Sequence, residues 1–313
     1  MKKLRFVVSL TTKDNDYQIE QAHAAEEAAA RVGVDIEIIY ADNDAIQQSQ
    51  QLLKIIQSNS DSHPDGIIFE PVGGTAFPQV ARAAAAAGIG WVVMNREVDY
   101  LGDLRKNYRV PIFSISSDHE EIGRIQGQQL SALLPEGGSV LLIQGPAESL
   151  AAKLRTSGMY ETKPISVQVK LMKGNWTEVG AYKSVSSWLK LSTSQQTPIQ
   201  VVAAQNDAMA MGARKAFQEV QDLAVRDRFQ NLIYLGIDGV VSTGQTWLKR
   251  GLLTATIAVP PNTRQAIEML AHSVQTGTIP PERTLTTPKS MPAVTDLVKA
   301  RPAVKSTTAG TGH

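Results

Sequence analysis

Short apolar runs rich in β-branched residues alternate with longer segments of helical apolar spacing along almost the whole chain. In the first third, this alternation predicts strands at residues 4–10, 35–41, 66–69 and 90–94. Helices are predicted after the first three strands, at 17–32, at 45–58 and through 83–87. Gly33 and Gly88 stand where two of these helices should end, because glycine readily adopts the left-handed conformation that closes a helix.

The same alternation restarts in the second part of the chain. It predicts strands at residues 113–116, 139–144, 167–171, 200–204 and 233–236, with helices between them. Asp118 and Glu121 have the spacing of a helix-capping box, which predicts a helix that reaches residue 134. Parallel strands need crossover helices, so strict alternation predicts mostly parallel sheets. The uninterrupted apolar run 140–143 is typical of a sheet covered on both faces.

The 313 residues exceed what one ordinary hydrophobic core accommodates, roughly 100–150 residues. We therefore predict an α/β protein with two successive doubly wound lobes. The chain becomes rich in Pro and Thr after residue 280, and residues 306–313 are small and polar. We expect residues 306–313 to form a disordered tail.

Charge and cysteine content exclude several classes of partner and site. The 31 basic and 30 acidic residues are interspersed and leave a net charge of +1, so we expect no nucleic-acid partner. The absence of cysteine excludes disulfides and thiolate chemistry. Polar residues 11–14 follow residues 4–10 at once, so this segment predicts a first strand and no signal peptide. The residues alone leave the compartment open.

Catalytic and metal-binding motifs are missing from the sequence. The five histidines are scattered without metal-ligand spacing, and neither a G-x-S-x-G elbow nor a P-loop occurs. We therefore expect no enzyme, no cofactor and no metal. The alternative is an α/β enzyme that acts on a sugar, with Asp238 or Asp14 as its acid or base.

Polar and aromatic residues follow the predicted strands, where open α/β sheets bind ligands. These residues are Asn15, Tyr17, Asn95, Arg96, Arg155, Trp176, Asn206, Asp207 and Asp238. Guanidinium groups and carboxylates bond adjacent hydroxyl groups, and aromatic rings cover the apolar faces of sugars. The set therefore favours a neutral polyhydroxylated ligand over a nucleotide or a fatty acid.

Each of these residues also has a purely structural interpretation. Asn206 would serve as a helix N-cap and Asp238 as a turn residue. Trp176 and Tyr17 would belong to the core, and Arg155 would pair with a surface carboxylate. The joint placement of the residues at strand ends favours the binding interpretation.

Several segments resemble one family of binding proteins. Residues 204–212, AQNDAMAMG, resemble the Q-N-D-x-M-A-L-G segment of the ribose- and galactose-type periplasmic sugar-binding proteins of ABC transporters. Residues 236–239, GIDG, resemble their G-[FV]-D-G turn, and residues 254–258 resemble their crossover strand. Residues 143–145, followed by Arg155, are similar to their second-lobe loop and helix. The ligand domain of LacI-type repressors has the same core.

The resemblance implies a periplasmic-binding-protein-like fold of type I whose lobes are discontinuous in sequence. One lobe would hold residues 1–117 and 260–287, and the other would hold 118–259 and 288–305. A three-stranded hinge would join them near Ser117, Val259 and Thr287, and closure would be a hinge motion.

The resemblance also implies which residues contact the ligand. The implied contacts are Asn15, Tyr17, Arg96, Arg155, Trp176, Asn206 and Asp238. The sequence departs from the ribose-type pattern at Gln18, Asn95 and Val259, which remove an aromatic ring, a charge and an amide from the pocket. Gln18 and Asn95 stay in the predicted binding set, but a familiar pentose is disfavoured as the ligand.

We therefore expect a monomeric solute-binding protein that closes on a sugar or polyol and presents it to an ABC importer permease. The family resemblance implies a periplasmic location. A cytoplasmic sugar sensor of the same fold is the alternative that the missing signal peptide favours. A repressor would need a DNA-binding module, and no helix-turn-helix precedes Leu4.

Overall fold

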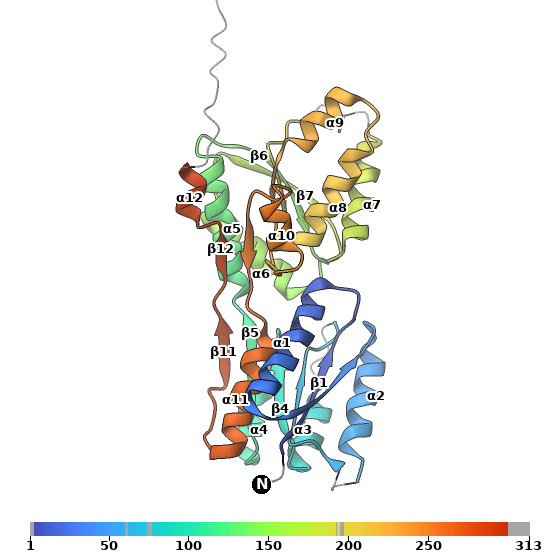
Figure 1. Cartoon of the computed structure of the whole chain (residues 1–313), viewed down its shortest axis with the longest axis vertical. Coiled ribbons are helices and arrows are strands. Elements are labelled where there is room, and N and C mark those ends of the chain that lie inside the picture. The colour runs from blue at the N-terminus through green and yellow to red at the C-terminus, as the bar shows by residue number, and fades with distance from the viewer. Residues whose placement is uncertain (1–2, 60–61, 74–76, 192, 195–196, 300–313) are drawn as a thin grey trace, which may run out of the picture.

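The computed structural model describes residues 3–59, 62–73, 77–191, 193–194 and 197–299. These residues form two α/β lobes that follow one another along the long axis of the molecule (Figure 1). The chain passes from one lobe to the other three times. The predicted tail, residues 306–313, lies outside the described residues. In the part of the chain that is described, no helix is both long and apolar enough to cross a membrane.

The first lobe contains a six-stranded sheet in the order β11-β5-β4-β3-β1-β2, and all of its strand pairs are parallel. Its strands are β1 Arg5–Leu10, β2 Asp35–Tyr40, β3 Gly66–Phe69, β4 Gly90–Met94, β5 Ile112–Ser117 and β11 Arg283–Thr286. Its helices are α1 Asp16–Val32, α2 Ala45–Ile56, α3 Pro78–Ala86, α4 Leu101–Asn107 and α11 Asn262–Thr276.

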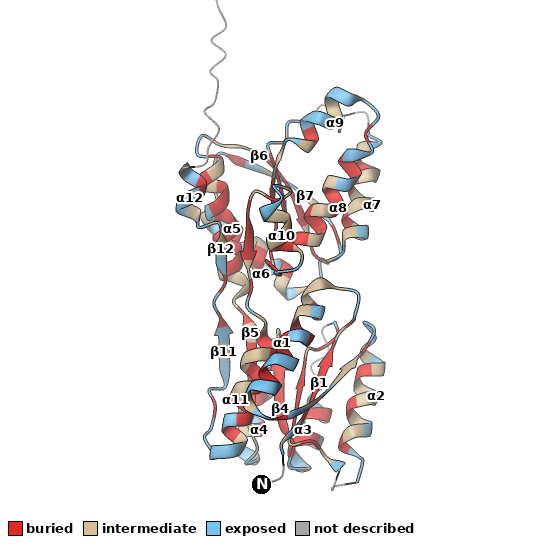
Figure 2. Ribbon diagram, in the orientation of Figure 1, coloured by how far each residue is buried: buried red, intermediate tan, exposed pale blue. Residues whose placement is uncertain are grey.

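Successive residues of β1 show why this sheet is buried on both faces. Phe6 and Val8 pack with α1 and α11 in one hydrophobic cluster. Val7, between them, points to the opposite face and packs with residues of α2, α3 and α4. Side chains of a strand alternate between faces, so an uninterrupted apolar strand requires a helical layer on each side. Figure 2 shows the resulting buried centre of the lobe.

The second lobe contains a four-stranded parallel sheet in the order β7-β6-β8-β9. Its strands are β6 Gly138–Gln144, β7 Val167–Lys173, β8 Val201–Ala204 and β9 Ile233–Leu235. Its helices are α5 His119–Leu133, α6 Leu150–Thr162, α7 Glu178–Leu189, α8 Asp207–Gln218, α9 Leu223–Gln230, α10 Gly244–Lys249 and α12 Val294–Lys299. An antiparallel pair, β10 Thr256–Ala258 and β12 Lys289–Met291, lies beside this sheet.

The predicted strands all occur, with ends that differ from the prediction by at most two residues. Gly33 closes α1 in the left-handed conformation, at φ 72°. Asp118 caps α5, since its carboxylate accepts a hydrogen bond from the Glu121 amide at 2.9 Å. The elements without a prediction lie mainly after residue 280, where β11, β12 and α12 are short and Thr-rich or flanked by proline.

Glycines let α5 and α6 approach each other closely. A Cβ atom added at Gly123 would lie 2.2 Å from the carbonyl oxygen of Arg155, and one added at Gly158 would lie 2.1 Å from the carbonyl oxygen of Glu120. Neither distance is compatible with a side chain. The two glycines therefore set the position of α6, and α6 carries Arg155.

We predict that Gly158→Ala lowers the free energy of unfolding by about 1–3 kcal/mol, because the new methyl group would force backbone atoms of α5 and α6 apart. Gly102→Ala in α4 is the matched control, since its Cβ would lie 3.6 Å from the Glu282 carboxylate, an ordinary contact. Urea unfolding of both variants measures the difference. Equal stability of Gly158→Ala and the parent protein would contradict this account of the packing.

Candidate functional site

A cavity of about 500 Å³ lies between the lobes, at the carboxyl ends of both parallel sheets. All nine residues predicted to bind a ligand line it: Asn15, Tyr17, Gln18, Asn95, Arg96, Arg155, Trp176, Asn206 and Asp238. An adjoining cavity of about 360 Å³ shares part of this wall, including Asn15, Trp176 and Asp238. We refer to the larger space as the ligand cavity.

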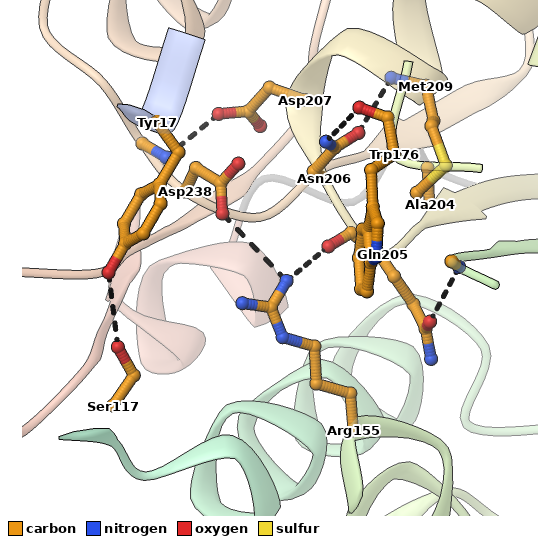
Figure 3. A network of polar contacts seen from close by, with 12 residues as sticks. Tyr17, Ser117, Arg155, Trp176, Ala204, Gln205, Asn206, Asp207, Met209 and Asp238 are labelled. Atoms are coloured by element: carbon orange, nitrogen blue, oxygen red, sulfur yellow. Dashed lines mark hydrogen bonds and ion pairs between the residues drawn. The ribbon is translucent and has the colours of Figure 1, made fainter. Parts of the chain in front are cut away.

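Arg155 is a buried cation in the wall of the ligand cavity. Its guanidinium donates to the carbonyl oxygen of Gln205, and its Nη1 lies 3.8 Å from Oδ1 of Asp238 (Figure 3). The guanidinium carbon lies 5.4 Å from the ring centroid of Trp176. Burial lowers the pKa of Arg155, whereas the Asp238 carboxylate acts against this shift. Its partner is therefore a buried carboxylate of the cavity, so the surface-pair interpretation of Arg155 is wrong.

Asp238 occupies the turn after β9 with the unusual φ of 104°. Its amide donates to Ile257 and its carbonyl accepts from Val259, both at 3.0 Å, so the turn is fixed to the strand beside it. Burial raises the pKa of Asp238 to about 7, Arg155 opposes this rise, and Asp16 adds to it. Asp238 is thus both a turn residue and a carboxyl group in the ligand cavity.

Asp207 holds the turn that contains Asp238 in place by hydrogen bonds. Its carboxylate accepts from the Gly239 amide at 2.8 Å and from the Thr256 hydroxyl at 2.6 Å. A Cβ atom at Gly236 would lie 2.0 Å from one of its oxygens, so the turn can approach only as glycine. Burial, followed by the charge of Asp238, raises the pKa of Asp207 well above its ordinary value. Asp207 therefore holds the loop that carries Asp238.

Asn206 has the capping role that its position predicted and a second role as well. Its side-chain oxygen accepts from the Met209 amide at 2.9 Å and caps α8. Its Nδ2 donates to the carbonyl oxygen of Trp176 at 3.0 Å. Asn206 therefore caps α8 and also lines the ligand cavity.

Trp176 lies at the junction of the lobes. Asn175 and Trp176 adopt φ values of 54° and 63°, which are uncommon outside glycine. The ring packs against Gly145, where a Cβ atom would lie 2.2 Å from it. The Trp176 carbonyl accepts from Asn206 of its own lobe and, at 3.5 Å, from Nδ2 of Asn15 in the other lobe.

The start of α1 places three of the predicted residues. Asn15 caps this helix by accepting from the amides of Tyr17 and Gln18 at 2.9 and 3.3 Å. The Tyr17 hydroxyl lies 3.4 Å from Ser117 Oγ, and its ring packs against a second-lobe cluster that includes Ile257. Burial raises the pKa of Tyr17. Tyr17 therefore belongs both to the packing between the lobes and to the cavity wall.

Asn95 and Arg96 follow β4. The Asn95 side-chain oxygen accepts from Asn262 Nδ2 at 2.5 Å and from the Ser117 amide at 3.3 Å, so it contacts two of the segments that connect the lobes. Arg96 donates to the carbonyl oxygen of Gly73. Both residues line the ligand cavity.

Glu70 and His119 are cavity residues that the sequence prediction missed. Glu70 follows β3 directly, and its carboxylate accepts from Gln18 Nε2 at 2.8 Å. Burial raises the pKa of Glu70, and hydrogen bonds from Gln18 and Asn95 oppose the rise. The rule that selected residues at strand ends would have selected Glu70, because it follows the predicted strand 66–69.

His119 is the first residue of α5. Burial lowers the pKa of its ring well below the ordinary value, and the charges of Arg155 and Arg96 lower it further, so the imidazole is neutral. Within the described residues, neither ring nitrogen has a hydrogen-bond partner. Both ring nitrogens are buried, so His119 lines the cavity without offering a solvent-exposed nitrogen to it.

The site offers hydrogen-bonding groups, charges and aromatic surface. Among the residues that the structure describes, no group of three or more His, Asp or Glu side chains could hold a metal ion. The arrangement can bind a small polar molecule between two lobes. The expectation of no cofactor and no catalysis stays a prediction.

Known proteins with the same architecture give this site a context. The chain is 24% identical over 261 residues to the D-allose-binding periplasmic protein of Escherichia coli strain K12, over 82% of this chain and 79% of that protein. An ABC transporter periplasmic solute binding protein from Actinobacillus succinogenes 130z with bound D-allose superposes with a TM-score of 0.78 at 20% identity, over 92% and 97% of the two chains.

The Caulobacter myo-inositol binding protein bound to myo-inositol superposes with a TM-score of 0.74 at 19% identity, over 95% of each chain. These likenesses confirm the predicted two-lobed α/β fold. A family model described as a periplasmic binding protein domain matches residues 6–278, and this range includes every residue predicted to line the site. The chain therefore belongs to the periplasmic binding protein family.

Proposed function

We propose that this protein binds a small sugar or polyol between its lobes and presents it to an ABC importer. The observation that carries the proposal is the ligand cavity, to which both lobes contribute hydrogen-bonding side chains at the carboxyl ends of their sheets. The allose- and inositol-binding relatives of the same fold support the choice of a polyhydroxylated ligand. Reversible binding without turnover is part of the proposal.

The cavity wall suits a ring that carries several hydroxyl groups. Arg155 donates to hydroxyl oxygens, and Asp238 beside it accepts from hydroxyl groups. The Trp176 ring offers an apolar surface to the C–H face of a sugar. Because groups of both lobes contact the ligand, binding stabilises the closed arrangement over an open one.

We also propose that three connections form a hinge. They lie between β5 and α5, between β10 and α11, and between β11 and β12. The lobes would then comprise residues 1–117 with 260–287 and residues 118–259 with 288–305. We propose a monomer in the periplasm, where the relatives named above act according to their names.

The first prediction concerns ligand binding itself. We expect at least one sugar or polyol to raise the melting temperature in a thermal-shift screen of monosaccharides, polyols and glycosides. A ligand at 100 times its dissociation constant adds about 2.7 kcal/mol to the stability of the folded state. The binding function is wrong if the whole panel leaves the melting temperature unchanged. Unchanged sugars after prolonged incubation would support binding without turnover.

The second prediction concerns Arg155. Replacing it by alanine removes charge-assisted hydrogen bonds worth about 1.5–3 kcal/mol, so affinity for the ligand found in the screen should fall about 10- to 100-fold. Calorimetric titration measures the loss, and the melting temperature of the unliganded variant shows whether it is folded. Arg82→Ala, on the exposed side of α3, is the control. Unchanged affinity of Arg155→Ala would contradict the proposed role.

The third prediction concerns pH. The pKa of Asp238 is raised from 3.8 to about 7, so the folded protein holds a proton between these pH values that the unfolded chain has lost. Stability from this group is therefore present at low pH and lost as the pH rises through about 7, by up to about 1.4 kcal/mol per pH unit.

Urea unfolding of the unliganded protein between pH 5 and 8 measures this slope. The decline should be smaller in Asp238→Asn, which keeps the shape of the side chain and cannot ionise. Raised pKa values of Glu70 and Asp207 contribute in the same direction, so the difference between the two proteins isolates Asp238. Identical slopes in the two proteins would refute the assignment.

A further inference from the structure

The ligand cavity contains a carboxylate, that of Glu70, which forms no salt bridge with another described residue. Glu70 lies at the end of β3, and its Oε2 accepts from Gln18 Nε2 at 2.8 Å. In the described part of the chain, no Lys or Arg nitrogen lies within 4.0 Å of this carboxylate. A carboxylate removed from water is costly unless an opposite charge or several hydrogen bonds compensate it. A positive group in the cavity would therefore offset the cost of burying the Glu70 carboxylate.

The two arginines of the cavity are engaged elsewhere. Arg155 faces Asp238 at 3.8 Å and donates to a main-chain carbonyl. Arg96 donates to the carbonyl oxygen of Gly73. The charge of Arg96 lowers the pKa of Glu70, but less than the hydrogen bonds from Gln18 and Asn95 do. Among the described residues, no positive charge therefore neutralises Glu70 at contact distance.

Gln18 holds Glu70 in a fixed orientation. The Gln18 side-chain oxygen accepts from the Thr11 amide at 3.1 Å, which directs its NH₂ group toward Glu70. Gln18 is itself buried, at 5% exposure. Gln18 thus orients Glu70, while its role as a direct ligand contact stays a prediction. The carboxylate is preorganised before a ligand arrives, which reduces the entropy lost on binding.

The remaining surroundings disfavour an anion. Exposed carboxylates of Asp14 and Glu148 stand at the rim of the ligand cavity. The adjoining cavity is lined by five acidic residues and by no Lys, Arg or His: Asp14, Asp16, Glu178, Asp207 and Asp238. Carboxylates gathered around a cleft attract cations toward it. The neutral imidazole of His119 lines the cavity without adding a positive charge.

We propose that the ligand is an aminated sugar or polyol whose protonated amine pairs with Glu70, while its hydroxyl groups bond Arg155 and Asp238. This inference rests on the proposed function and specifies its substrate class. A hydroxyl group in place of the amine would bond Glu70 but leave its charge uncompensated. A carboxylate or phosphate on the ligand would meet like charge at the rim and at Glu70.

Matched pairs of compounds test the inference. Calorimetric titration at pH 7 compares glucosamine with glucose, galactosamine with galactose, mannosamine with mannose, and scyllo-inosamine with scyllo-inositol. For the best-binding pair, the amine should bind at least tenfold more tightly than the hydroxyl compound. The advantage should decrease as salt is added, because salt screens a charge pair at a partly open cavity.

Glu70→Gln is the decisive variant, since it keeps the shape of the side chain and removes its charge. It should abolish the tenfold preference, so that the amine and the hydroxyl compound bind the variant with affinities within about twofold of each other. Glu136→Gln, at an exposed position outside the cavity lining, should leave the preference unchanged. If Glu70→Gln does not fold, the affinities of the paired compounds for the parent protein still show whether the amine is preferred.

The outcomes separate this inference from the proposed function. Hydroxyl compounds that bind as tightly as their amines overturn the inference and leave the binding function standing. An amine preference that survives in Glu70→Gln also overturns it, since the charge would then lie elsewhere. If no member of either class binds, the proposed function fails as well.

Discussion

The cavity of this protein depends on keeping the charge of Arg155 compensated where little water can reach it. The guanidinium and the Asp238 carboxylate have side chains only 7% and 11% exposed. A buried charge without a partner would destabilise the fold by several kcal/mol. The second lobe therefore has to place both groups accurately, and much of its local structure serves that purpose. Gly123 and Gly158 bring α6 close to α5 from one side.

From the other side, Asp207 pins the loop that carries Asp238 by bonds to Gly239 and Thr256. The pKa values of Asp207 and Asp238 are raised by burial first and by neighbouring carboxylates second. The protein thus buries two carboxyl groups close to one cation. Among the described residues, Arg155 Nε has no hydrogen-bond partner, so the compensation of this side chain is incomplete.

The sequence allowed the fold and most of the site to be predicted, because both follow from local signals. Short apolar runs predict parallel strands. The rule that open α/β sheets bind ligands at the carboxyl ends of their strands then selected Asn15, Arg155 and Asp238, which line the ligand cavity. The strands after residue 280 were not predicted, because β11 and β12 are only four and three residues long and pair with strands distant in sequence.

Roles were harder to predict than positions. By the family resemblance, Gln18 removes an aromatic ring from the pocket. In the structure its side chain orients Glu70, a contact that only the folded chain brings about. By the same resemblance, Asn95 removes a charge. In the structure it accepts hydrogen bonds from Asn262 and from the Ser117 amide. Such contacts join residues separated by 22 to 167 positions, and no local pattern records them.

The contact across the lobes at Trp176 uses the main chain of that residue. Amides of Asn15 and Asn206, from opposite lobes, share its carbonyl oxygen, whereas its indole ring faces Arg155. A main-chain carbonyl persists whatever side chain the position carries. The ring can therefore be exchanged for another during evolution or engineering, which alters the surface offered to a ligand, while the latch between the lobes keeps its acceptor. A substitution at this residue can therefore change the preference for a ligand and leave the contact between the lobes unchanged.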